Sequence, residues 1–303
     1  MIDIALVGTG GMMPLANRFL SSMLCRIDGS MILFDCGEGT QVSLRLLGWG
    51  FKNIDKICFT HFHGDHISGL PGLLLTMANA NRTEPLEFFG PAGLEMYVKS
   101  LCVIARDLPF PLHFNEWSKP SSYTNGKIII NSLELNHRIP CYAYSLELLR
   151  RGKFDPERAK QQNIPLKLWG VLQKQTEESI VYEGIEYTPE MVLGAPRKGL
   201  KLVFCTDTRP VTNLPEFAKG ADLFICEGMY GEPEKQEKAA EHKHMSYEEA
   251  ATIAKEANVK ELWLTHFSPA MPDPHNYIQY ATAIFPNSKV GKDRMTTTLC
   301  YND

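Results

Sequence analysis

The sequence predicts a layered α/β fold in a single domain. Short apolar runs that favour β-strands end at a histidine or an aspartate, and segments with helical spacing lie between them. With 303 residues, 44% of them hydrophobic, the chain can bury a large core, and α/β sandwiches of this length are commonly one domain. Because loops at the open ends of strands present side chains without disturbing the core, we expect these polar residues to form one site.

The densest group of polar side chains is the run His61-Phe62-His63-Gly64-Asp65-His66. Residues 54–60 before it are apolar and β-prone, and residues 69–75 after it indicate a turn that runs into a helix. Imidazole and carboxylate groups suit Zn²⁺ or a similar divalent ion, and four of them on one tight turn would repel or compete unless a cation organised them. We therefore expect a metal at this strand-to-helix turn.

Three further strands are predicted to end at a possible ligand. The runs 133–136, 201–206 and 261–265 stop at His137, Asp207 and His266. Five histidines and two aspartates are too many ligands for one tetrahedral zinc and about right for two. Two metals ~3.5–4 Å apart need a carboxylate between them, and Asp207, alone at its strand end, is the predicted bridge.

Seven motifs give the chain a resemblance to a known family: LVGTGG at 6–11, FDCGEGTQ at 34–41, THFHGDHISGLPG at 60–72, FGP at 89–91, NHRIPC at 136–141, DTR at 207–209 and LTHFS at 264–268. With these motifs the chain resembles the metallo-β-lactamase fold, and within it the ribonuclease Z family of transfer-RNA 3′-end processing nucleases. The resemblance covers nearly the whole chain. It implies a four-layer αββα sandwich and two Zn²⁺ per subunit.

The resemblance also implies a role for each of the seven expected ligands. His61, His63 and His137 would hold one metal, Asp65, His66 and His266 the other, and Asp207 would bridge them. In this family a hydroxide held between the ions attacks the phosphorus of an RNA phosphodiester, and Asp65 doubles as ligand and proton acceptor. Mn²⁺ or Fe²⁺ are alternative metals. Iron is less expected than zinc, because di-iron relatives usually replace the second histidine of the motif with Glu and this chain keeps His63.

A candidate general acid lies outside the ligand set. Ser246 and Glu249 have the S-x-x-E spacing of a capping box, and apolar residues follow at helical spacing. His244 lies just before this helix N-terminus, where phosphate is favoured, and can donate a proton to a leaving 3′-oxygen. The resemblance assigns the general acid to His244 and its partner to Glu227. His242, two residues away, is the alternative.

Charge is unevenly distributed along the chain. The net charge is −4, yet residues 150–201 hold ten Lys or Arg and seven Asp or Glu, a local balance of +3. This polar, proline-containing segment predicts an excursion at about residues 145–200 of one domain spanning 1–303. Ribonuclease Z proteins hold their transfer-RNA-gripping arm in this interval, which the resemblance implies here. A solvated basic face is the alternative, because +3 is small beside the phosphate neutralisation that RNA binding requires.

The chain departs from the family in three places. Residues 164–170 read IPLKLWG where the arm normally has Pro-Pro-Gly-Pro, and residues 268–271 read SPAM where an arginine usually follows the last ligand. Residues 226–229 read CEGM where the family has HEAT. None of these positions is an expected ligand, so the departures concern the identity of the substrate more than hydrolysis.

The cysteines, the absence of long apolar stretches and three further polar residues lead to additional expectations. Eight scattered cysteines without a C-x-x-C pair suggest reduced thiols in a cytoplasmic protein, with Cys205 and Cys226 in the core. Neither a signal sequence nor a long apolar stretch is evident, so no membrane association is expected. His113 and His275 are expected to be solvated or hydrogen-bonded rather than ligands, and Asp35 either orients a ligand histidine or forms a turn.

The expected function is that of a homodimeric endonuclease that removes the 3′ trailer of precursor transfer RNA, with no DNA substrate. A phosphodiesterase of the same fold that acts on a small or cyclic nucleotide is the main alternative. A thioester or lactam hydrolase and a non-catalytic RNA-binding module are less expected, because the ribonuclease-Z-like motifs extend beyond the ligands and every metal position is filled.

Overall fold

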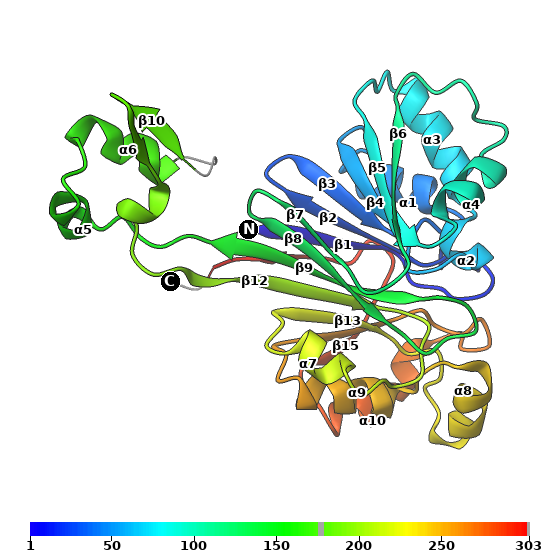
Figure 1. The fold of residues 1–303 in the computed structure, drawn as a ribbon. Helices are drawn as coiled ribbons and strands as arrows, with labels where there is room; N and C mark the ends of the chain where they lie inside the picture. Colours follow the sequence, from blue (N-terminus) through cyan, green and yellow to red (C-terminus); the bar gives the residue numbers. More distant parts are fainter. Residues whose placement is uncertain (175–178, 302–303) are drawn as a thin grey trace.

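Two seven-stranded sheets pack face to face in the computed structural model of the chain, which describes residues 1–174 and 179–301 (Figure 1). The first sheet has the strand order β16 (Thr296–Leu299), β1 (Ile2–Gly8), β2 (Ser22–Ile27), β3 (Ser30–Phe34), β4 (Ile54–Cys58), β5 (Leu86–Pro91), β6 (Leu112–Trp117). The second has the order β15 (Ser288–Val290), β14 (Leu262–Thr265), β13 (Leu223–Glu227), β12 (Arg197–Cys205), β9 (Tyr142–Arg150), β8 (Ile128–Glu134), β7 (Ser122–Asn125).

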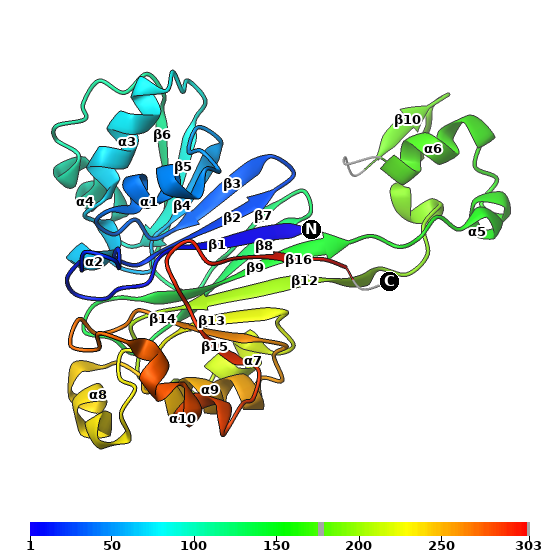
Figure 2. The same cartoon turned by 180° about the vertical axis from the view of Figure 1, so that it is seen from behind.

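Helices cover the outer face of each sheet. The first sheet carries α1 (Thr40–Leu47), α3 (Leu70–Asn79) and α4 (Leu94–Leu101), and the second carries α7 (Leu214–Ala218), α9 (Tyr247–Glu256) and α10 (Ile278–Thr282) (Figures 1 and 2). Shorter elements complete the sandwich: α2 (Gly64–Ile67), α8 (Gln236–His242), and the 3₁₀ turns η2 (Pro233–Lys235) and η3 (Pro274–Tyr277). The predicted four-layer αββα sandwich is confirmed.

The core follows the two-residue period of the strands. On β12, Leu202 and Phe204 enter the layer between the two sheets, whereas Val203 and Cys205 face the helices of the second sheet. Successive side chains of a strand point to opposite faces, so one apolar run such as 200–205 supplies both core layers. Seven of the eight cysteines are buried, among them the expected core residue Cys226, and all eight are free thiols.

Strand direction decides where the loops meet. Strands β3 to β6 are mutually parallel in the first sheet, as are β12 to β15 in the second. β8 is antiparallel to β9, and β9 is antiparallel to β12, so β8 runs in the same direction as β12. The carboxyl ends of β8, β12 and β14 therefore lie at one end of the second sheet. The segment after β4 of the first sheet meets them there, since His63 contacts His137 and His66 contacts His266.

The expected strands are present with small shifts in their ends. β8 ends at Glu134 rather than directly before His137, and Leu135 N still donates to Cys141 O at 2.9 Å just beyond the last paired residue. The expected helix at 69–75 is α3, preceded by the four-residue α2 that begins within the histidine cluster. The capping box at the start of α9 is confirmed, with Ser246 and Glu249 each bonded to the other's backbone amide.

An excursion leaves the second sheet between β9 and β12 (Figure 1). It holds α5 (Pro156–Gln161), α6 (Leu166–Lys174), η1 (Pro189–Met191) and the hairpin of β10 (Ile180–Tyr182) and β11 (Ile185–Tyr187), around a small core of its own. β9 runs to Arg150 and β12 begins at Arg197, so the excursion spans 151–196, shorter at both ends than expected. No described helix is long and apolar enough to cross a membrane.

Candidate metal centre

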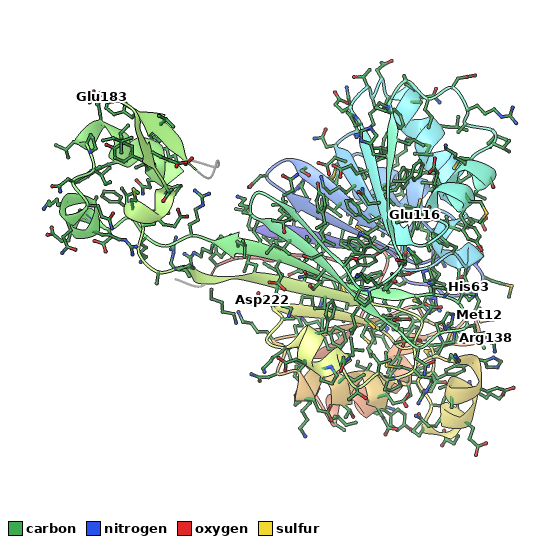
Figure 3. The ribbon with its side chains drawn as sticks, viewed as in Figure 1. Met12, His63, Glu116, Arg138, Glu183 and Asp222 are labelled. Atoms are coloured by element: carbon green, nitrogen blue, oxygen red, sulfur yellow. The ribbon has the colours of Figure 1, made fainter. Side chains whose placement is uncertain are left out.

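All seven expected ligands lie together at one end of the sandwich. His63 marks this end in Figure 3, next to Met12 and Arg138 and opposite Glu183 of the excursion. The seven side chains come from the loops after β4, β8, β12 and β14 and from the first turn of α2. Two groups of them have donor atoms close enough to hold an ion: His61, His63, His137 with Asp207, and Asp65, His66 with His266.

The first group surrounds one oxygen of Asp207. His61 Nε2 and His137 Nε2 each lie 3.7 Å from Asp207 Oδ2. The same two nitrogens lie 3.0 and 3.2 Å from His63 Nδ1. Four ligands held tetrahedrally at ~2.0–2.1 Å from a metal are about 3.3–3.4 Å apart, so these spacings fit a single ion.

The second group surrounds the other oxygen of Asp207. Oδ1 lies 3.2 Å from His66 Nε2 and 3.1 Å from His266 Nε2. Asp65 Oδ2 completes the group at 3.6 Å from His66 and 3.3 Å from His266. Asp207 therefore presents one oxygen to each group, which is the arrangement that a bridging carboxylate requires.

The unpaired atoms of this cluster fit a cation. Asp207 Oδ1 is buried without a hydrogen-bond partner among the described residues. Nε2 of His66 and Nε2 of His266 face each other at 3.1 Å. A buried carboxylate oxygen without a hydrogen bond is costly, and a metal ion among these donors would satisfy all three atoms together.

The outer nitrogens of three histidines are held by the protein. His66 Nδ1 donates to Asp35 Oδ2 at 2.8 Å, and His137 Nδ1 lies 3.2 Å from the carbonyl oxygen of Lys243. His61 Nδ1 contacts Thr60 Oγ1 at 3.1 Å, and Thr60 in turn donates to Asp35. These contacts place the ring proton on Nδ1 and leave Nε2 free toward the cluster. Asp35 thus orients histidines of the cluster rather than only forming a turn.

The backbone adopts unusual conformations at the ligand loops. Asp35, Asp207 and His266 all have positive φ values, of 55°, 31° and 57°. Such a conformation is uncommon for residues with a Cβ and costs of order 1–3 kcal/mol, so the surrounding structure must impose it. Gly11 makes room for the last ligand, because a Cβ there would lie 2.7 Å from His266 Cε1.

The electrostatic environment attracts positive charge. Burial opposes charge on Asp207, but His266, His66 and His61 outweigh it and hold the carboxyl pKa well below its usual value. Burial likewise opposes charge on His66, and Asp207 and Asp35 outweigh it, raising the imidazole pKa well above its usual value. Carboxylates that stabilise a proton at this position stabilise a metal cation by the same attraction.

His244 lies beside the cluster and is paired with Glu227. Its Nδ1 is 3.0 Å from Glu227 Oε2 and 4.0 Å from Asp207 Oδ2. Burial lowers the pKa of His244, but the Glu227 carboxylate outweighs burial and raises it to about 9. The other Glu227 oxygen accepts from Thr208 N at 2.5 Å, which fixes the carboxylate. The Glu227 carboxylate therefore favours the protonated imidazole.

Arg209 connects this region to the ligand turn. It donates to the carbonyl oxygen of His244 and makes a bidentate ion pair with Glu249. Glu249 also accepts from Ser246 N at 2.9 Å, so the start of α9, the turn after Asp207 and His244 form one hydrogen-bonded unit. His242 contributes nothing to this unit, since it is exposed and contacts Arg138 instead.

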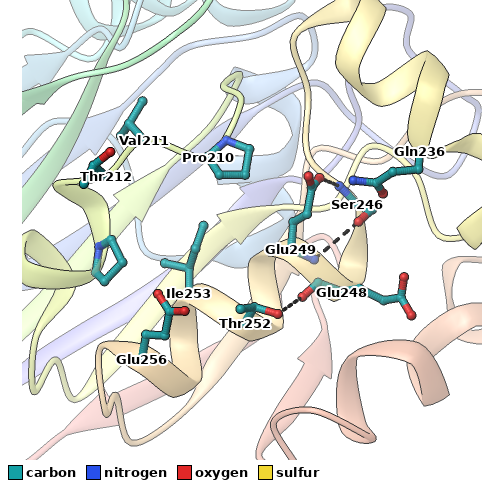
Figure 4. A pocket seen from close by; sticks show the side chains of 11 residues that line it. Pro210, Val211, Thr212, Gln236, Ser246, Glu248, Glu249, Thr252, Ile253 and Glu256 are labelled. Carbon is teal, nitrogen blue, oxygen red and sulfur yellow. Dashed lines mark hydrogen bonds between the residues drawn. The ribbon is translucent and has the colours of Figure 1, made fainter.

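The cluster opens to solvent through a pocket of about 210 Å³. Its lining combines donors of both groups with His244, Arg138, His242 and Tyr230. A cavity of about 480 Å³ beside α9, shown in Figure 4, is lined by glutamates, threonines and apolar residues and by no histidine. The smaller pocket therefore holds the reactive groups.

Several contributors were not predicted. Thr60, Thr206, Gly11 and Arg209 all support the ligands or His244, yet none was singled out. A threonine immediately precedes His61, Asp207 and His266 in the sequence, which is a repeated signal that could have been noticed. His113 and His275 lie outside the cluster, as expected.

The chain matches known proteins along its whole length. Ribonuclease Z of Lachnoclostridium phytofermentans is 53% identical over 303 residues, covering 100% of this chain and 99% of that one. The family described as "Anti-Pycsar protein Apyc1" matches residues 2–102, and "Beta-lactamase superfamily domain" matches residues 189–267.

Solved structures share the fold. Human tRNase Z, short form, superposes with a TM-score of 0.72 at 24% identity, covering 99% of this chain and 100% of that chain. YhfI of Bacillus subtilis, a metallo-β-lactamase fold protein, has a TM-score of 0.69 at 20% identity over 98% of each chain.

The αββα sandwich and the donor cluster at its strand ends define a hydrolase of the metallo-β-lactamase superfamily. Within that superfamily the chain belongs to the ribonuclease Z family, because its relatives of that name are about half identical to it from end to end. The resemblance seen in the sequence motifs is thereby confirmed.

Proposed function

We propose that the protein is an endonuclease that hydrolyses one phosphodiester of precursor transfer RNA and releases the 3′ trailer. One observation carries this proposal: Asp207 presents one oxygen to each of two donor groups, and His244, paired with Glu227, lies beside them. Such a site can supply a nucleophile, neutralise a phosphate and protonate a leaving oxygen. The full-length similarity to proteins named ribonuclease Z supports RNA as the substrate.

The seven donors fit two divalent ions, and zinc suits them best. The imidazole and carboxylate donors and their spacing match tetrahedral Zn²⁺, while Mn²⁺ and Fe²⁺ are alternatives. His61, His63 and His137 would hold one ion, and Asp65, His66 and His266 the other, with Asp207 between them. When bound, such ions lower the pKa of coordinated water from 15.7 toward ~7 and so supply hydroxide at neutral pH.

The protein's own residues handle the protons and orient the cluster. Asp65 accepts from Met12 N at 2.6 Å, which holds its carboxylate at the mouth of the pocket as the proton acceptor for the attacking water. His244 donates a proton to the leaving 3′-oxygen, and Glu227 keeps it charged for that step. Asp35 and Thr60 hold the ligand histidines in the tautomer that metal binding requires.

The excursion at 151–196 is the candidate arm of one domain spanning 1–303. It projects from the end of the sandwich opposite the site, as Glu183 and His63 show in Figure 3. An arm in this position suits a homodimer in which it grips RNA that the partner cleaves. Apolar side chains exposed on α1, α3 and α4, such as Leu46 at 64% and Met96 at 57%, offer a surface for the second copy. We place the protein in the cytoplasm, where precursor transfer RNA is processed.

Cleavage mapping tests this function. Protein loaded with zinc should cut a precursor transfer RNA after the discriminator base, leaving a 3′-hydroxyl on the transfer RNA. A small or cyclic nucleotide phosphodiesterase is the competing function, and full-length identity to ribonuclease Z proteins disfavours it. Efficient hydrolysis of bis(p-nitrophenyl) phosphate and of a cyclic nucleotide, with no cut in any precursor transfer RNA, would refute the nuclease assignment.

A further inference from the structure

A basic pair borders the mouth of the metal pocket. Arg138 follows His137 in the loop after β8, and His242 is the last residue of α8. Both side chains are exposed, and both line the pocket that contains Asp65, His137 and His244. Figure 3 shows Arg138 beside His63 and Met12 at the site end of the sandwich.

The two side chains are hydrogen-bonded to each other. Arg138 Nη2 lies 3.1 Å from His242 Nδ1 and 3.4 Å from the carbonyl oxygen of Glu241. A guanidinium can only donate, so Nδ1 of His242 accepts and its ring proton lies on Nε2. The pair therefore offers a fixed positive charge and an oriented N–H donor beside the reacting groups.

No carboxylate forms an ion pair with Arg138 or His242 among the described residues. Neighbouring Lys243 uses its ammonium to hold the loop, donating to Asn136 Oδ1 at 3.1 Å and His137 O at 3.0 Å. The guanidinium of Arg138 thus has no carboxylate partner, although the chain has a net charge of −4. At the mouth of a phosphodiester site, such a charge can bind an anionic group of the substrate.

We propose that Arg138 and His242 form a binding site for the phosphate next to the scissile one. This inference rests on the proposed function, because a neighbouring phosphate exists only in an oligonucleotide substrate. Arg138 would contact a non-bridging oxygen through its free N–H groups, and His242 would add a hydrogen bond from Nε2. The site favours a nucleic-acid chain over an ester with a single phosphate.

Binding of two short oligonucleotides tests the proposal. The 2′-O-methylated UpU has one internucleotide phosphate and UpUpU has two, so UpUpU can place a phosphate on either side of the one at the metals. Dissociation constants on zinc-loaded protein are measured by fluorescence anisotropy with labelled oligonucleotides. We expect UpUpU to bind about tenfold more tightly than UpU, beyond the statistical factor of two, as one charge-assisted hydrogen bond would give.

Two variants and a control decide the outcome. Arg138→Gln should reduce the ratio of the two constants to the statistical factor, and Arg138→Lys should keep most of it. Lys238→Gln removes the same charge from an exposed position of α8 outside the pocket and should leave the ratio unchanged. A wild-type ratio near two, or an Arg138→Gln ratio equal to that of Lys238→Gln, overturns the inference. A protein that cleaves no precursor transfer RNA refutes the proposed function, whereas this ratio is read without any cleavage.

Discussion

At the scale of single residues, Asp207 has the central position because each of its oxygens belongs to a different donor group. Oδ2 faces His61 and His137, and Oδ1 faces His66 and His266. A carboxylate shared in this way couples the two groups, since removing it leaves each group one negative donor short.

Asp207→Ala should therefore deplete both ions rather than one. We expect wild-type protein to contain close to two divalent ions per chain and the variant to contain far fewer. Metal content is measured by mass spectrometry after dialysis against metal-free buffer, with Asp107→Ala, an exposed carboxylate distant in sequence from every ligand, as the control. One ion in the wild type, unchanged in Asp207→Ala, would contradict the two-ion site.

His244→Ala should lower turnover of precursor transfer RNA by ~10²–10⁴, the usual scale for positioned acid–base catalysis, while metal content stays intact. Bis(p-nitrophenyl) phosphate has a good leaving group and should be affected much less. His242→Ala is the comparison two residues upstream, and because His242 is inferred to bind the neighbouring phosphate, this variant should raise KM for RNA rather than lower turnover. A large loss in His242→Ala with normal turnover in His244→Ala would move the acid to His242, and loss of metal in His244→Ala would make His244 a ligand.

Glu227 is expected to set the pH range over which His244 can act as an acid. The carboxylate raises the pKa of His244 to about 9, so the proton is present below that pH and is lost as the pH rises through it. Glu227→Gln removes the charge and returns the pKa toward 6.5, so the alkaline fall of kcat/KM for RNA should begin at lower pH. Bound cations lower the pKa in both proteins, and the measured quantity is the difference between the two pH profiles. Superimposable profiles would exclude His244 as the titrating acid.

At the scale of elements, the start of α9 both stabilises the helix and connects it to His244 and to the turn after β12. Ser246 caps the helix, Glu249 closes the capping box, and Arg209 ties both to the carbonyl of His244 and to the turn after β12. The capping box orients the helix, and the ion pair connects that helix to a ligand loop. A substitution that removes the capping box or the ion pair should therefore shift the position of His244.

Arg209→Met should displace His244 more than it destabilises the fold. The variant removes the donor to the carbonyl oxygen of His244 and the ion pair of Glu249, which keeps only its hydrogen bond from Ser246 N, so kcat for RNA should fall while KM changes little. Ser246→Ala is the comparison, because losing the cap costs about 1 kcal/mol of unfolding free energy in urea without removing the ion pair. Arg209→Lys should recover part of the activity. Equal falls of kcat in Arg209→Met and Ser246→Ala would reduce Arg209 to a general role in stability.

At the scale of the whole molecule, the arm lies far from the site, and its charge differs from that of the strands at its base. Residues 151–196 carry six Lys or Arg and seven Asp or Glu, so the arm itself is not basic. The local excess of +3 in residues 150–201 comes from Arg150, Arg197, Lys198 and Lys201, which lie on β9 and β12 at its base. The net positive charge of this segment therefore lies at the base, near the sheet, whereas the Lys and Arg of the arm itself are balanced by its acidic residues.

Deleting the arm should raise KM for precursor transfer RNA sharply and leave hydrolysis of bis(p-nitrophenyl) phosphate nearly unchanged. Arg150 and Arg197 are directly opposed in the sheet, so Asn-Gly in place of 151–196 can close a β-hairpin, and the arm's separate core is removed as a unit. The salt dependence of RNA binding should lose two to four phosphate contacts, at roughly 0.7–0.9 in log–log slope for each. An unchanged KM would show that the arm does not hold the substrate.

Association through the helices of the first sheet is tested separately. Leu46 on α1 is 64% exposed, and Leu46→Arg places a charge in the apolar surface of α1, α3 and α4. We expect the wild type to sediment as a dimer and this variant as a monomer with normal metal content. Val181→Arg changes an apolar side chain of the arm that is 72% exposed and should not alter the mass. A monomeric wild type would refute the homodimer.

The local pattern of the sequence was sufficient to name the side chains of the donor cluster and the class of fold. A strand that ends in histidine or aspartate is visible in a few consecutive residues, and the seven side chains named from such patterns are those that the structure brings together. The capping box at Ser246 is similarly local, since both of its hydrogen bonds join residues three apart. The four-layer αββα sandwich was predicted from the resemblance of the motifs to the family.

Only the tertiary structure decided which groups surround those ligands. Contacts such as Asp35 with His66, Arg209 with Glu249 and Arg138 with His242 join residues that are distant in sequence, and no periodic pattern encodes them. The net charge of the arm could also not be predicted from the sequence pattern, because it depends on the residues at which β9 ends and β12 begins. Short-range preferences act between neighbours along the chain, whereas these contacts arise from the packing of the two sheets, which brings the ends of separate strands together.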